Sequence, residues 1–497
     1  MNTDWSSRNL VRECFSLVGK QVKVAGWVAA RRDHGKIIFI DLRDQSGMLQ
    51  VVFTPLQPDV SGLQVGEESG IQKINEKPQP LGRVVTGLTP AIKETYEIAS
   101  GLRDEWVVLI EGTIAERPKG MQNPESPNGT IELQAESLTV LNPANTPPFP
   151  VTGDGKDIEE ELRLKYRYLD LRRPRLQENL RMRNEVTLFM RNWLKVRDFI
   201  EVETPILTKG TPEGAREFLV PSRIYPGKFY VLPQSPQQYK QLLMVAGLER
   251  YFQIARCFRD EDQRGDRQPE FTQLDVEMSF VSQEEVLQLG EELFTEMTRA
   301  LFPEKHLTFE PWPRLTYKEA MERYGTDKPD LRKNTADQNE LAFAFVVDFP
   351  MFEKGVDGAL QPSHHPFTTP NPEDLAKLDS DPLSVRAWSY DIVLNGFEVS
   401  SGSIRIHNRT LQEKIFAILG LTPEKTKEKF GHILEAFEYG APPHGGFAPG
   451  IDRIAMILAG EGSISEVIAF PKTGTARDPM MGSPSTIEPK QLRELGL

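Results

Sequence analysis

The spacing of hydrophobic and polar residues divides the chain into a front part with a period of two and a longer part with mixed periods. In residues 21–55 and 106–143, five short segments alternate β-branched or aromatic residues with polar ones. Turn residues such as His34-Gly35 and Asn128-Gly129 separate these segments. Five short strands with few helical residues between them are typical of a small barrel of the oligonucleotide-binding (OB) type.

The pattern changes after a stretch rich in Pro and Gly, residues 142–157. From there to the C-terminus, strand-like segments such as "FTQLDVEMSF" alternate with helical ones such as "GIDRIAMILAG". Such a mixture predicts an α+β fold, with a mostly antiparallel sheet flanked by helices. We therefore predict an N-terminal five-stranded OB-fold β-barrel at 1–143 with an insertion at 56–105, a linker at 144–160, and an α+β domain at 161–497.

The composition is typical of a globular protein from a reducing compartment. None of the apolar runs in the 497 residues approaches the roughly 18 residues that a membrane span needs. The N-terminal residues lack the basic and apolar regions of a secretory signal. The two cysteines, Cys14 and Cys257, are too few for a disulfide framework or a four-thiolate zinc site. We expect a cytoplasmic protein with no membrane partner.

The charge is unevenly distributed along the chain. A net charge of −13 argues against a protein that binds nucleic acid over its whole surface. Residues 162–197, however, hold eleven Lys or Arg against three acidic residues. Two interpretations of this stretch stay open: a basic face that binds phosphate groups, and a helix whose arginine stems pack on apolar surface.

Three segments contain chemistry-bearing residues, at 199–221, 258–277 and 445–460. The common nucleotide and zinc motifs are missing from the sequence, which has no GxxxxGK[ST], no GxGxxG after a strand and no HExxH. The second segment places four Asp, three Glu and three Arg in twenty positions between strand-like segments. On its own, a charge-rich hairpin of this kind is most often a solvated loop tip.

Together, the three segments resemble motifs 1, 2 and 3 of the class II aminoacyl-tRNA synthetases, subclass IIb. The finer similarity is to bacterial-type aspartyl-tRNA synthetases, and it spans nearly the whole chain. It is carried further by "TPEGAREFLVPSR", "QSPQQYKQLLMVAG", "HHPFTTP", "GFEVSSGSIRIHN" and the tail "QLRELGL". The resemblance implies a ligase that activates L-aspartate with ATP and transfers it from aspartyl-adenylate to the 3′ end of tRNA(Asp). It also implies a homodimer, with motif 1 around Pro205 at the interface.

The resemblance assigns a nucleotide site to motifs 2 and 3. In the family, the arginine that matches Arg259 bridges the amino acid carboxylate and the α-phosphate, a position that suits a bidentate guanidinium. Phe271 would stack under adenine, and Arg453 would cover its other face by a cation–π contact. Arg259 and Arg453 are therefore the predicted catalytic residues. The predicted ATP-binding residues are Arg259, Asp260, Glu261, Gln268, Phe271, Glu398, Gly450, Ile451, Asp452 and Arg453.

The resemblance also implies an aspartate pocket and a magnesium site. Arg405 would clamp the substrate side chain bidentately, with Lys240 as a point charge. The predicted aspartate-binding residues are Glu213, Ser235, Gln237, Lys240, Arg259, Asp275, His364 and Arg405, of which Ser235, Gln237 and Asp275 match those around the substrate ammonium. Asp391 and Glu398 match Mg²⁺ ligands of the family, although without the motifs a surface pair would be the better interpretation.

The barrel is expected to bind the tRNA anticodon, because aromatic stacking and side-chain hydrogen bonds together recognise single-stranded bases. By similarity to the family, Phe39 stacks on the central uridine. The alternative for Phe39 is core packing within its strand. The predicted anticodon-binding residues are Arg32, Asp33, His34, Phe39, Gln50 and Glu132.

The sequence departs from the family pattern at several places. The domain of roughly a hundred residues that interrupts the catalytic half of bacterial-type enzymes is essentially absent, since only "RKNTADQNELAFA" stands at its place. Ser400 and Ser401 replace glycines beside the aspartate pocket, and Ala30 replaces an arginine before Arg31. In relatives, a histidine at the position of His34 tends to accompany relaxed anticodon choice, which predicts tRNA(Asn) as a second partner.

Three alternatives stay open at this stage. An asparaginyl or lysyl enzyme of the same subclass is disfavoured by Lys240 and Arg405, which suit an acidic substrate. A non-catalytic RNA-binding relative would not need the predicted ATP and metal residues. A tRNA-independent ligase that forms amides would not need the barrel.

Overall fold

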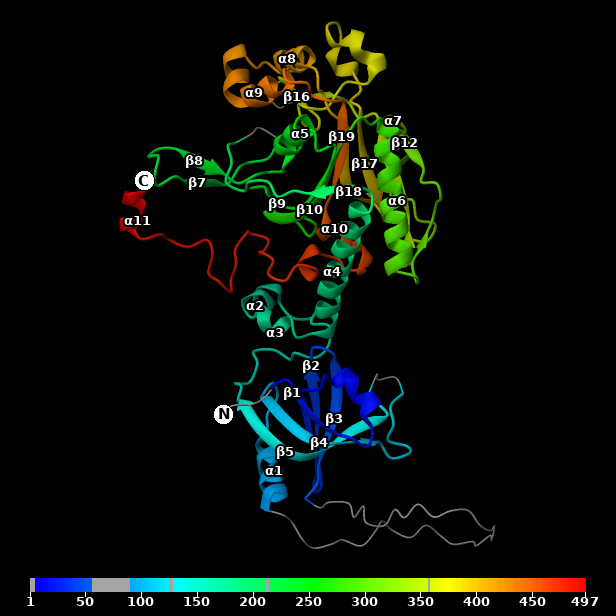
Figure 1. The fold of residues 1–497 in the computed structure, drawn as a ribbon, viewed down its shortest axis with the longest axis vertical. Helices are drawn as coiled ribbons and strands as arrows, with labels where there is room; N and C mark the ends of the chain where they lie inside the picture. The colour runs from blue at the N-terminus through cyan, green and yellow to red at the C-terminus, as the bar shows by residue number, and fades with distance from the viewer. Residues whose placement is uncertain (1–4, 56–89, 125–127, 211–213, 356–357) are drawn as a thin grey trace. The chain divides into compact units, whose positions relative to one another are not determined.

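The computed structural model describes residues 5–55, 90–124, 128–210, 214–355 and 358–497 (Figure 1). The chain divides into two compact units, Met1–Gly155 and Lys156–Leu497, and each is described by itself. The division lies within the predicted linker at 144–160, and the exact limits of the domains stay predictions. Within the described ranges, no helix has both the length and the apolar character to cross a bilayer.

The first unit is a closed barrel of five strands in the order β1-β2-β3-β5-β4. The strands are β1 (Gln21–His34), β2 (Ile37–Asp44), β3 (Gly47–Phe53), β4 (Val107–Glu116) and β5 (Ile131–Asn142). Alternation produces the core: Ile38, Ile40 and Leu42 of β2 are buried inside the barrel. A short 3-10 helix (Val11–Leu17) contributes Val11 and Cys14 to the same core. The predicted OB-type barrel is confirmed.

The predicted insertion at 56–105 is only partly described. Residues 56–89 lie outside the described ranges. Residues Pro90–Gly101 form helix α1, which packs against β5 and leads into β4. Arg31 of β1 reaches this end of the helix, where its Nη1 donates to the carbonyl of Leu102 at 3.3 Å. The last part of the insertion, residues 90–105, therefore belongs to the barrel unit.

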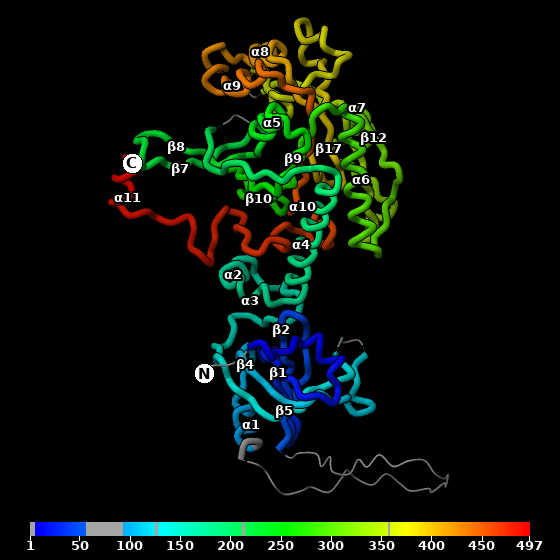
Figure 2. The backbone as a smooth tube through the Cα atoms, viewed as in Figure 1, coloured from blue at the N-terminus to red at the C-terminus, as the bar shows by residue number. Residues whose placement is uncertain are grey.

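The second unit is built on an eight-stranded sheet in the order β12-β14-β17-β18-β19-β10-β9-β6. These strands are β12 (Arg314–Thr316), β14 (Phe343–Val347), β17 (Ser389–Leu394), β18 (Phe397–Ile404), β19 (His444–Pro449), β10 (Glu270–Ser279), β9 (Arg250–Phe258) and β6 (Ile200–Glu201). Pairs within the sheet are antiparallel, except the parallel pairs at its two edges. Neighbouring strands come from distant parts of the chain, as the green of β10 and the orange of residues 444–449 show in Figure 2.

Helices pack against this sheet and share a large apolar core with it. The core combines side chains of α4 (Pro174–Lys195), α6 (Gln283–Leu301) and α10 (Ile451–Leu458) with those of the central strands. The other helices are α2 (Glu160–Lys165), α3 (Arg167–Asp170), α5 (Gln237–Val245), α7 (Tyr317–Tyr324), α8 (Arg409–Ile418), α9 (Pro423–Phe437) and α11 (Pro489–Glu494). Two-stranded sheets pair β7 (Leu219–Pro221) with β8 (Phe229–Val231), β11 (His306–Leu307) with β13 (Glu340–Leu341), and β15 (Phe352–Lys354) with β16 (Leu360–Pro362). The α+β prediction is confirmed.

The connection between α7 and β14 is short. It contains only β13 and the turns before it, so the roughly hundred-residue domain expected from the family has no counterpart at this place. The chain thus passes from α7, which follows the edge strand β12, through β13 to β14, which pairs with β12.

Three of the eleven basic residues at 162–197, Arg163, Arg167 and Arg173, are buried and paired, so they are not available to bind phosphate. Asp170, fully buried, accepts from Arg163 (3.0 Å), Arg167 (2.7 Å) and Arg173 (2.8 Å). Arg167 also donates to the backbone carbonyls of Ser465, Ile468 and Ala469 at 2.6–3.0 Å. These arginines therefore hold the segment after α10, rather than forming a free basic face.

Substituting Asp170 by asparagine is expected to destabilise the second unit strongly. The change keeps the shape but removes the negative charge that three buried guanidinium groups share. Breaking a buried ion pair by removing one partner costs about 3–5 kcal/mol. Urea unfolding followed by circular dichroism measures the loss, and Asp379→Asn is the matched control, because Asp379 pairs with Lys414 on the surface. A loss no larger than that of the control would contradict the role of Asp170.

Candidate active site

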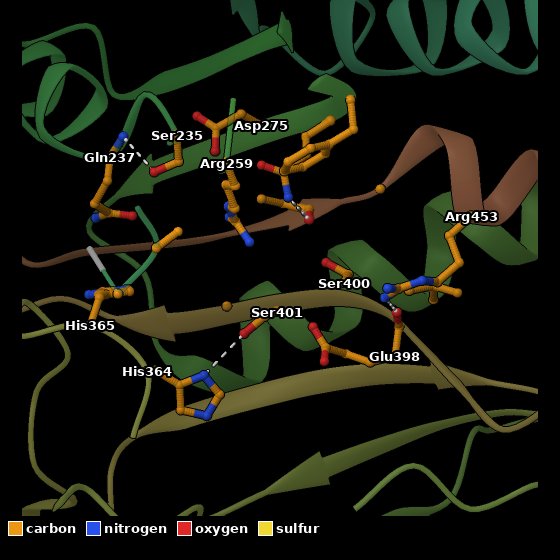
Figure 3. A pocket seen from close by; sticks show the side chains of 18 of the residues that line it. Ser235, Gln237, Arg259, Asp275, His364, His365, Glu398, Ser400, Ser401 and Arg453 are labelled. Carbon is orange, nitrogen blue, oxygen red and sulfur yellow. Dashed lines mark hydrogen bonds between the residues drawn. The ribbon is translucent and has the colours of Figure 1, made fainter. Parts of the chain in front are cut away.

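A cavity of about 460 Å³ opens on one face of the eight-stranded sheet (Figure 3). It is lined by the β9–β10 hairpin, by β18, by the start of α5 and by the start of α10. The predicted residues that line it are Ser235, Gln237, Lys240, Arg259, Glu261, Gln268, Phe271, Asp275, His364, Glu398, Arg405, Gly450, Asp452 and Arg453. Residues separated by more than two hundred positions therefore meet at one space.

The charge-rich hairpin is anchored to the rest of the unit at several points, although Asp260, Asp262 and Arg264 at its tip are exposed. The loop that joins β9 to β10 places the Arg259 guanidinium 5.0 Å from the ring centre of Phe271. Asp266 of this loop accepts from Arg453 Nη2 at 3.1 Å. The backbone of Gly265 accepts from Ile464 N at 3.0 Å. Because the loop is held at several points, the cations of motifs 2 and 3 face the cavity together.

The start of α10 divides its residues between the core and the cavity. Asp452 is buried and accepts from Arg183 and from the backbone N–H of Thr272 (2.8 Å), which ties the helix to β10. Ile451 is packed in the hydrophobic core and does not line the cavity. Arg453 donates to the backbone carbonyl of Glu398, and its buried Nε has no partner in the described chain. Arg453 is therefore held at the cavity by Glu398 and Asp266.

Two other predicted nucleotide contacts differ from the expectation. The amide of Gln268 is bonded at both ends to the backbone of Lys472, as Nε2 donates to its carbonyl (3.1 Å) and Oε1 accepts from its N–H (2.7 Å). Asp260 is exposed and does not line the cavity. Gln268 therefore holds the backbone at Lys472 in place, in addition to its predicted contact with ATP.

The cations of the predicted aspartate pocket are shared with two buried carboxylates. Lys240 Nζ lies 2.7 Å from Asp275 Oδ1 and 3.2 Å from Glu277 Oε2. Arg405 donates to both oxygens of Glu277, at 3.1 and 3.2 Å. Burial alone would raise the pKa of Glu277, but Arg405 and Lys240 outweigh it and lower this pKa to about 2. Glu277 therefore stays ionised and orients both cations before a substrate arrives.

Glu277 was not among the predicted site residues, although the sequence contains a signal for it. Positions 273, 275 and 277 alternate along β10, which places their side chains on one face of the sheet. A second unpredicted residue is His365, whose Nε2 accepts from Arg405 Nη1 at 2.7 Å. Its neighbour His364, predicted near the substrate carboxylate, has Nδ1 3.4 Å from Ser401 Oγ. Burial is the main cause that lowers the pKa of both histidines, so both are neutral near pH 7.

Asp391 and Glu398 come from adjacent strands joined by a tight turn. Asn395 and Gly396 have φ values of 51° and 84°, as a type I′ hairpin turn requires. Burial and the Glu398 carboxylate raise the pKa of Asp391 well above its usual range, and its Oδ1 is buried without a hydrogen-bond partner in the described chain. Asp391 does not line the cavity itself, but it faces Ser401, which does. Two crowded carboxylates with an unused oxygen fit an oxygen-preferring cation such as Mg²⁺. The described residues contain no group of three or more His, Cys, Asp or Glu that could hold a metal.

Glu213, predicted above the substrate ammonium, lies outside the described residues. The next residues along the chain, Gly214 and Ala215, line the cavity. Ala215 is fixed there by Gln234, whose Oε1 accepts from Ala215 N at 2.9 Å and whose Nε2 donates to Ala215 O at 3.1 Å.

The predicted anticodon residues lie on the barrel unit. Phe39 is half-buried, stands outside the barrel core, and contacts His34 edge to face, with ring centres 5.7 Å apart. Phe39 is therefore not a core residue, whereas its neighbours Ile38 and Ile40 pack in the core. Arg32 pairs with Asp41 at 2.8 Å, Arg31 with Asp33 at 2.6 Å, and Gln50 with Glu132 at 3.1 Å.

Arg117 is a further residue near this group that the sequence analysis missed. Its Nε donates to the carbonyl of Ile131 at 2.8 Å, next to Glu132. Burial lowers the pKa of Arg117, while Glu132 and Asp41 act in the opposite direction. Burial also raises the pKa of Glu132. Opposed charges thus lie close together on this part of the barrel.

Family models match both units. A model described as tRNA synthetases class II (D, K and N) matches residues 159–474. A model described as OB-fold nucleic acid binding domain matches residues 22–141.

Curated relatives match along nearly their whole length. A protein of Rubrobacter xylanophilus named aspartate–tRNA(Asp/Asn) ligase is 44% identical, and the alignment covers 97% of this chain and 94% of the relative. A protein of Dehalococcoides mccartyi with the same name is 40% identical, covering 96% of each. The first alignment spans 604 positions whereas this chain has 497 residues, so more than a hundred aligned positions have no residue here.

Solved structures share the fold. Asparaginyl-tRNA synthetase from Pyrococcus horikoshii, complexed with asparaginyl-adenylate, superposes with a TM-score of 0.70 at 23% identity, covering 94% of this chain and 98% of that one. A putative aspartyl-tRNA synthetase from Leishmania major gives a TM-score of 0.70 at 21% identity, with coverage of 95% and 94%. At these identities, the similarity concerns the fold.

Proposed function

The chain belongs to the class II tRNA synthetases of the D, K and N group, and from this premise we propose that it is an aspartate–tRNA ligase. The observation that carries the proposal is the meeting of Arg259, Arg453 and Arg405 at one cavity. The first two suit a nucleotide, and the third, held by Glu277, suits an acidic side chain. A non-catalytic relative would not require this set.

The proposed reaction has two steps. The α-carboxylate of aspartate attacks the α-phosphate of ATP in line, and pyrophosphate leaves. Arg259 lines the cavity next to Phe271, and in the proposed reaction its guanidinium stabilises the charge that develops on the phosphate. The 3′-hydroxyl of the terminal tRNA adenosine then attacks the carbonyl carbon of aspartyl-adenylate, and AMP leaves.

We propose Asp391 and Glu398 as the holders of Mg²⁺. The raised pKa of Asp391 and its unused Oδ1 support this assignment, since a divalent cation would relieve the repulsion between the two carboxylates. When bound, the ion would help to neutralise the phosphate charge of ATP.

The barrel is proposed to bind the anticodon through Phe39 and the polar residues around it. The names of the relatives include both tRNA(Asp) and tRNA(Asn), and His34 contacts Phe39. Both observations support the proposal that this chain also charges tRNA(Asn).

Two assays test these proposals. Aspartate-dependent ATP–pyrophosphate exchange tests activation, with asparagine and lysine in place of aspartate as the controls for the related enzymes. Charging of tRNA(Asp) and tRNA(Asn) transcripts tests transfer and anticodon choice. Exchange without aspartate charging of either tRNA would contradict the ligase proposal, and absence of tRNA(Asn) charging would remove the second partner.

Substituting Phe39 by alanine is expected to weaken tRNA binding by about 5- to 150-fold, because stacking on a base contributes about 1–3 kcal/mol. Exchange without tRNA should keep its rate, since Phe39 belongs to the barrel unit. Filter binding and exchange measure the two quantities. Equal losses in both would indicate misfolding and contradict a role confined to tRNA.

We propose that the chain forms a homodimer through motif 1. The large apolar side chains of Ile200, Ile206 and Leu207 are 48%, 47% and 53% exposed in the single chain, next to Pro205. Such a cluster supports an interface between copies. Light scattering tests it, and a monomer at micromolar concentration would contradict it.

The two cysteines are buried free thiols, which supports a reducing, cytoplasmic location.

A further inference from the structure

A chain of hydrogen bonds runs behind the part of the cavity where Ser235, Gln237 and Asp275 gather. Gln237 Nε2 donates to Gln241 Oε1 at 3.0 Å, one helical turn further along α5. Gln241 Nε2 lies 3.1 Å from His444 Nε2, at the start of β19. His444 Nδ1 lies 2.8 Å from the carbonyl oxygen of Pro442. Gln237 is 5% exposed, and both Gln241 and His444 are fully buried.

The direction of each hydrogen bond follows from the carbonyl of Pro442. A carbonyl oxygen only accepts, so His444 must carry its hydrogen on Nδ1. Burial lowers the pKa of His444, and Arg405 and His407 act in the same direction, while Glu277 and the Pro442 contact oppose them. The ring is then neutral, and its Nε2 presents a lone pair that accepts from Gln241 Nε2. Gln241 therefore directs its Oε1 towards Gln237, and this oxygen accepts from Gln237 Nε2.

The same series of hydrogen bonds determines which end of the Gln237 carboxamide faces the cavity. Since Nε2 of Gln237 is used by Gln241, its Oε1 is turned towards the open space, as the oxygen of Gln237 in Figure 3 shows. In the opposite orientation, two amide oxygens would face each other inside the protein. Leaving a buried polar group without its partner costs about 1–3 kcal/mol. The amide is therefore held in one orientation before a substrate binds.

We propose that Gln241 and His444 are positioning residues for recognition of the substrate ammonium group. They hold Gln237 Oε1 as an acceptor beside Ser235 and Asp275, so that an ammonium with three N–H donors meets oxygen atoms. Neither residue lines the cavity, and both act through Gln237. This inference rests on the proposed function, because the ammonium is that of aspartate.

Gln241→Met tests the proposal, since methionine keeps the volume and removes the amide. Without its acceptor, the Gln237 amide is expected to turn its NH₂ towards the cavity, and aspartate must then reverse it. The KM for aspartate in ATP–pyrophosphate exchange should rise about 10- to 100-fold. The KM for ATP and kcat should change less than about 3-fold, because the nucleotide part of the cavity is untouched. His444→Phe interrupts the same series of hydrogen bonds at His444 and should also raise the KM for aspartate.

Succinate separates this role from a general role in pocket structure. It has both carboxylates of aspartate but no ammonium. Its inhibition constant against aspartate should be the same in the wild type and in Gln241→Met. A pocket that had merely lost its shape would bind succinate more weakly as well.

Gln238→Met is the matched control. Gln238 is a buried glutamine of the same helix, and its Oε1 contacts a histidine, His432 of α9, but it does not line the cavity. Its substitution should leave the aspartate KM unchanged. In a Gln237→Ala background, Gln241→Met should add less than about 3-fold, since its effect passes through Gln237.

Three results would overturn the inference: an aspartate KM in folded Gln241→Met and His444→Phe equal to that of the control, a parallel loss of succinate binding, or full additivity with Gln237→Ala. If Gln241→Met does not fold, judged by its melting temperature, the outcome with His444→Phe decides. Absence of aspartate-dependent exchange in the wild type would instead reject the proposed function itself.

Discussion

Arg405→Ala should lower kcat/KM for aspartate by about two to four decades in ATP–pyrophosphate exchange. The guanidinium is buried, is oriented by both oxygens of Glu277, and lines the cavity. Truncating one partner of a buried, hydrogen-bonded charge pair costs about 2–5 kcal/mol. This loss falls on the transition state as well as on the ground state, because the side chain of aspartate stays bound through the reaction.

Removing Arg405 also leaves Glu277 with one cation in place of two. The negative charge of Glu277 would then repel the substrate carboxylate, which adds to the loss of the direct contact. Arg409→Ala is the matched control, since Arg409 lies four positions further along and pairs with Glu413 on the surface. A rate near that of the wild type, in Arg405→Ala protein with an unchanged melting temperature, would contradict the assignment of the aspartate pocket.

Arg259→Lys should lower the rate of exchange by about two to three decades. Lysine keeps the positive charge but replaces a planar fork of donors by a point charge, so it cannot bridge a carboxylate and a phosphate in the same way. Loss of one donor aimed at developing negative charge typically costs a factor of about 10²–10³ in kcat. The contact of the guanidinium with Phe271 would be lost as well.

The control for Arg259→Lys lies on the same hairpin. Arg256 is exposed on β9 and pairs with Glu270 of β10, outside the cavity. Arg256→Lys should keep the exchange rate within about 3-fold. Binding of tRNA by the barrel should be equal in both variants. A small effect of Arg259→Lys on kcat would argue that charge alone is needed and would reject the bridging role.

Much of the fold follows from local patterns in the sequence. The period of two predicts the barrel strands, because successive side chains of a strand face opposite sides, as Ile38 in the core and Phe39 outside it do. The alternation in β10 places Asp275 and Glu277 on one face for the same reason. Asn395-Gly396 marks the hairpin that brings Asp391 and Glu398 onto adjacent strands, since both residues tolerate positive φ.

The two kinds of unit therefore follow from local patterns, because periodicity and turn chemistry depend on near neighbours. Most of the predicted residues that line the cavity follow instead from the resemblance to the class II synthetases. The pairing of the charges, in contrast, depends on contacts between distant parts of the chain. Arg163 meets Glu466 three hundred positions away, and Lys240 and Arg405 share Glu277. The orientation of the Gln237 amide depends on His444, more than two hundred positions along the chain. Such partners are set by the packing of the sheet, so no local pattern contains them.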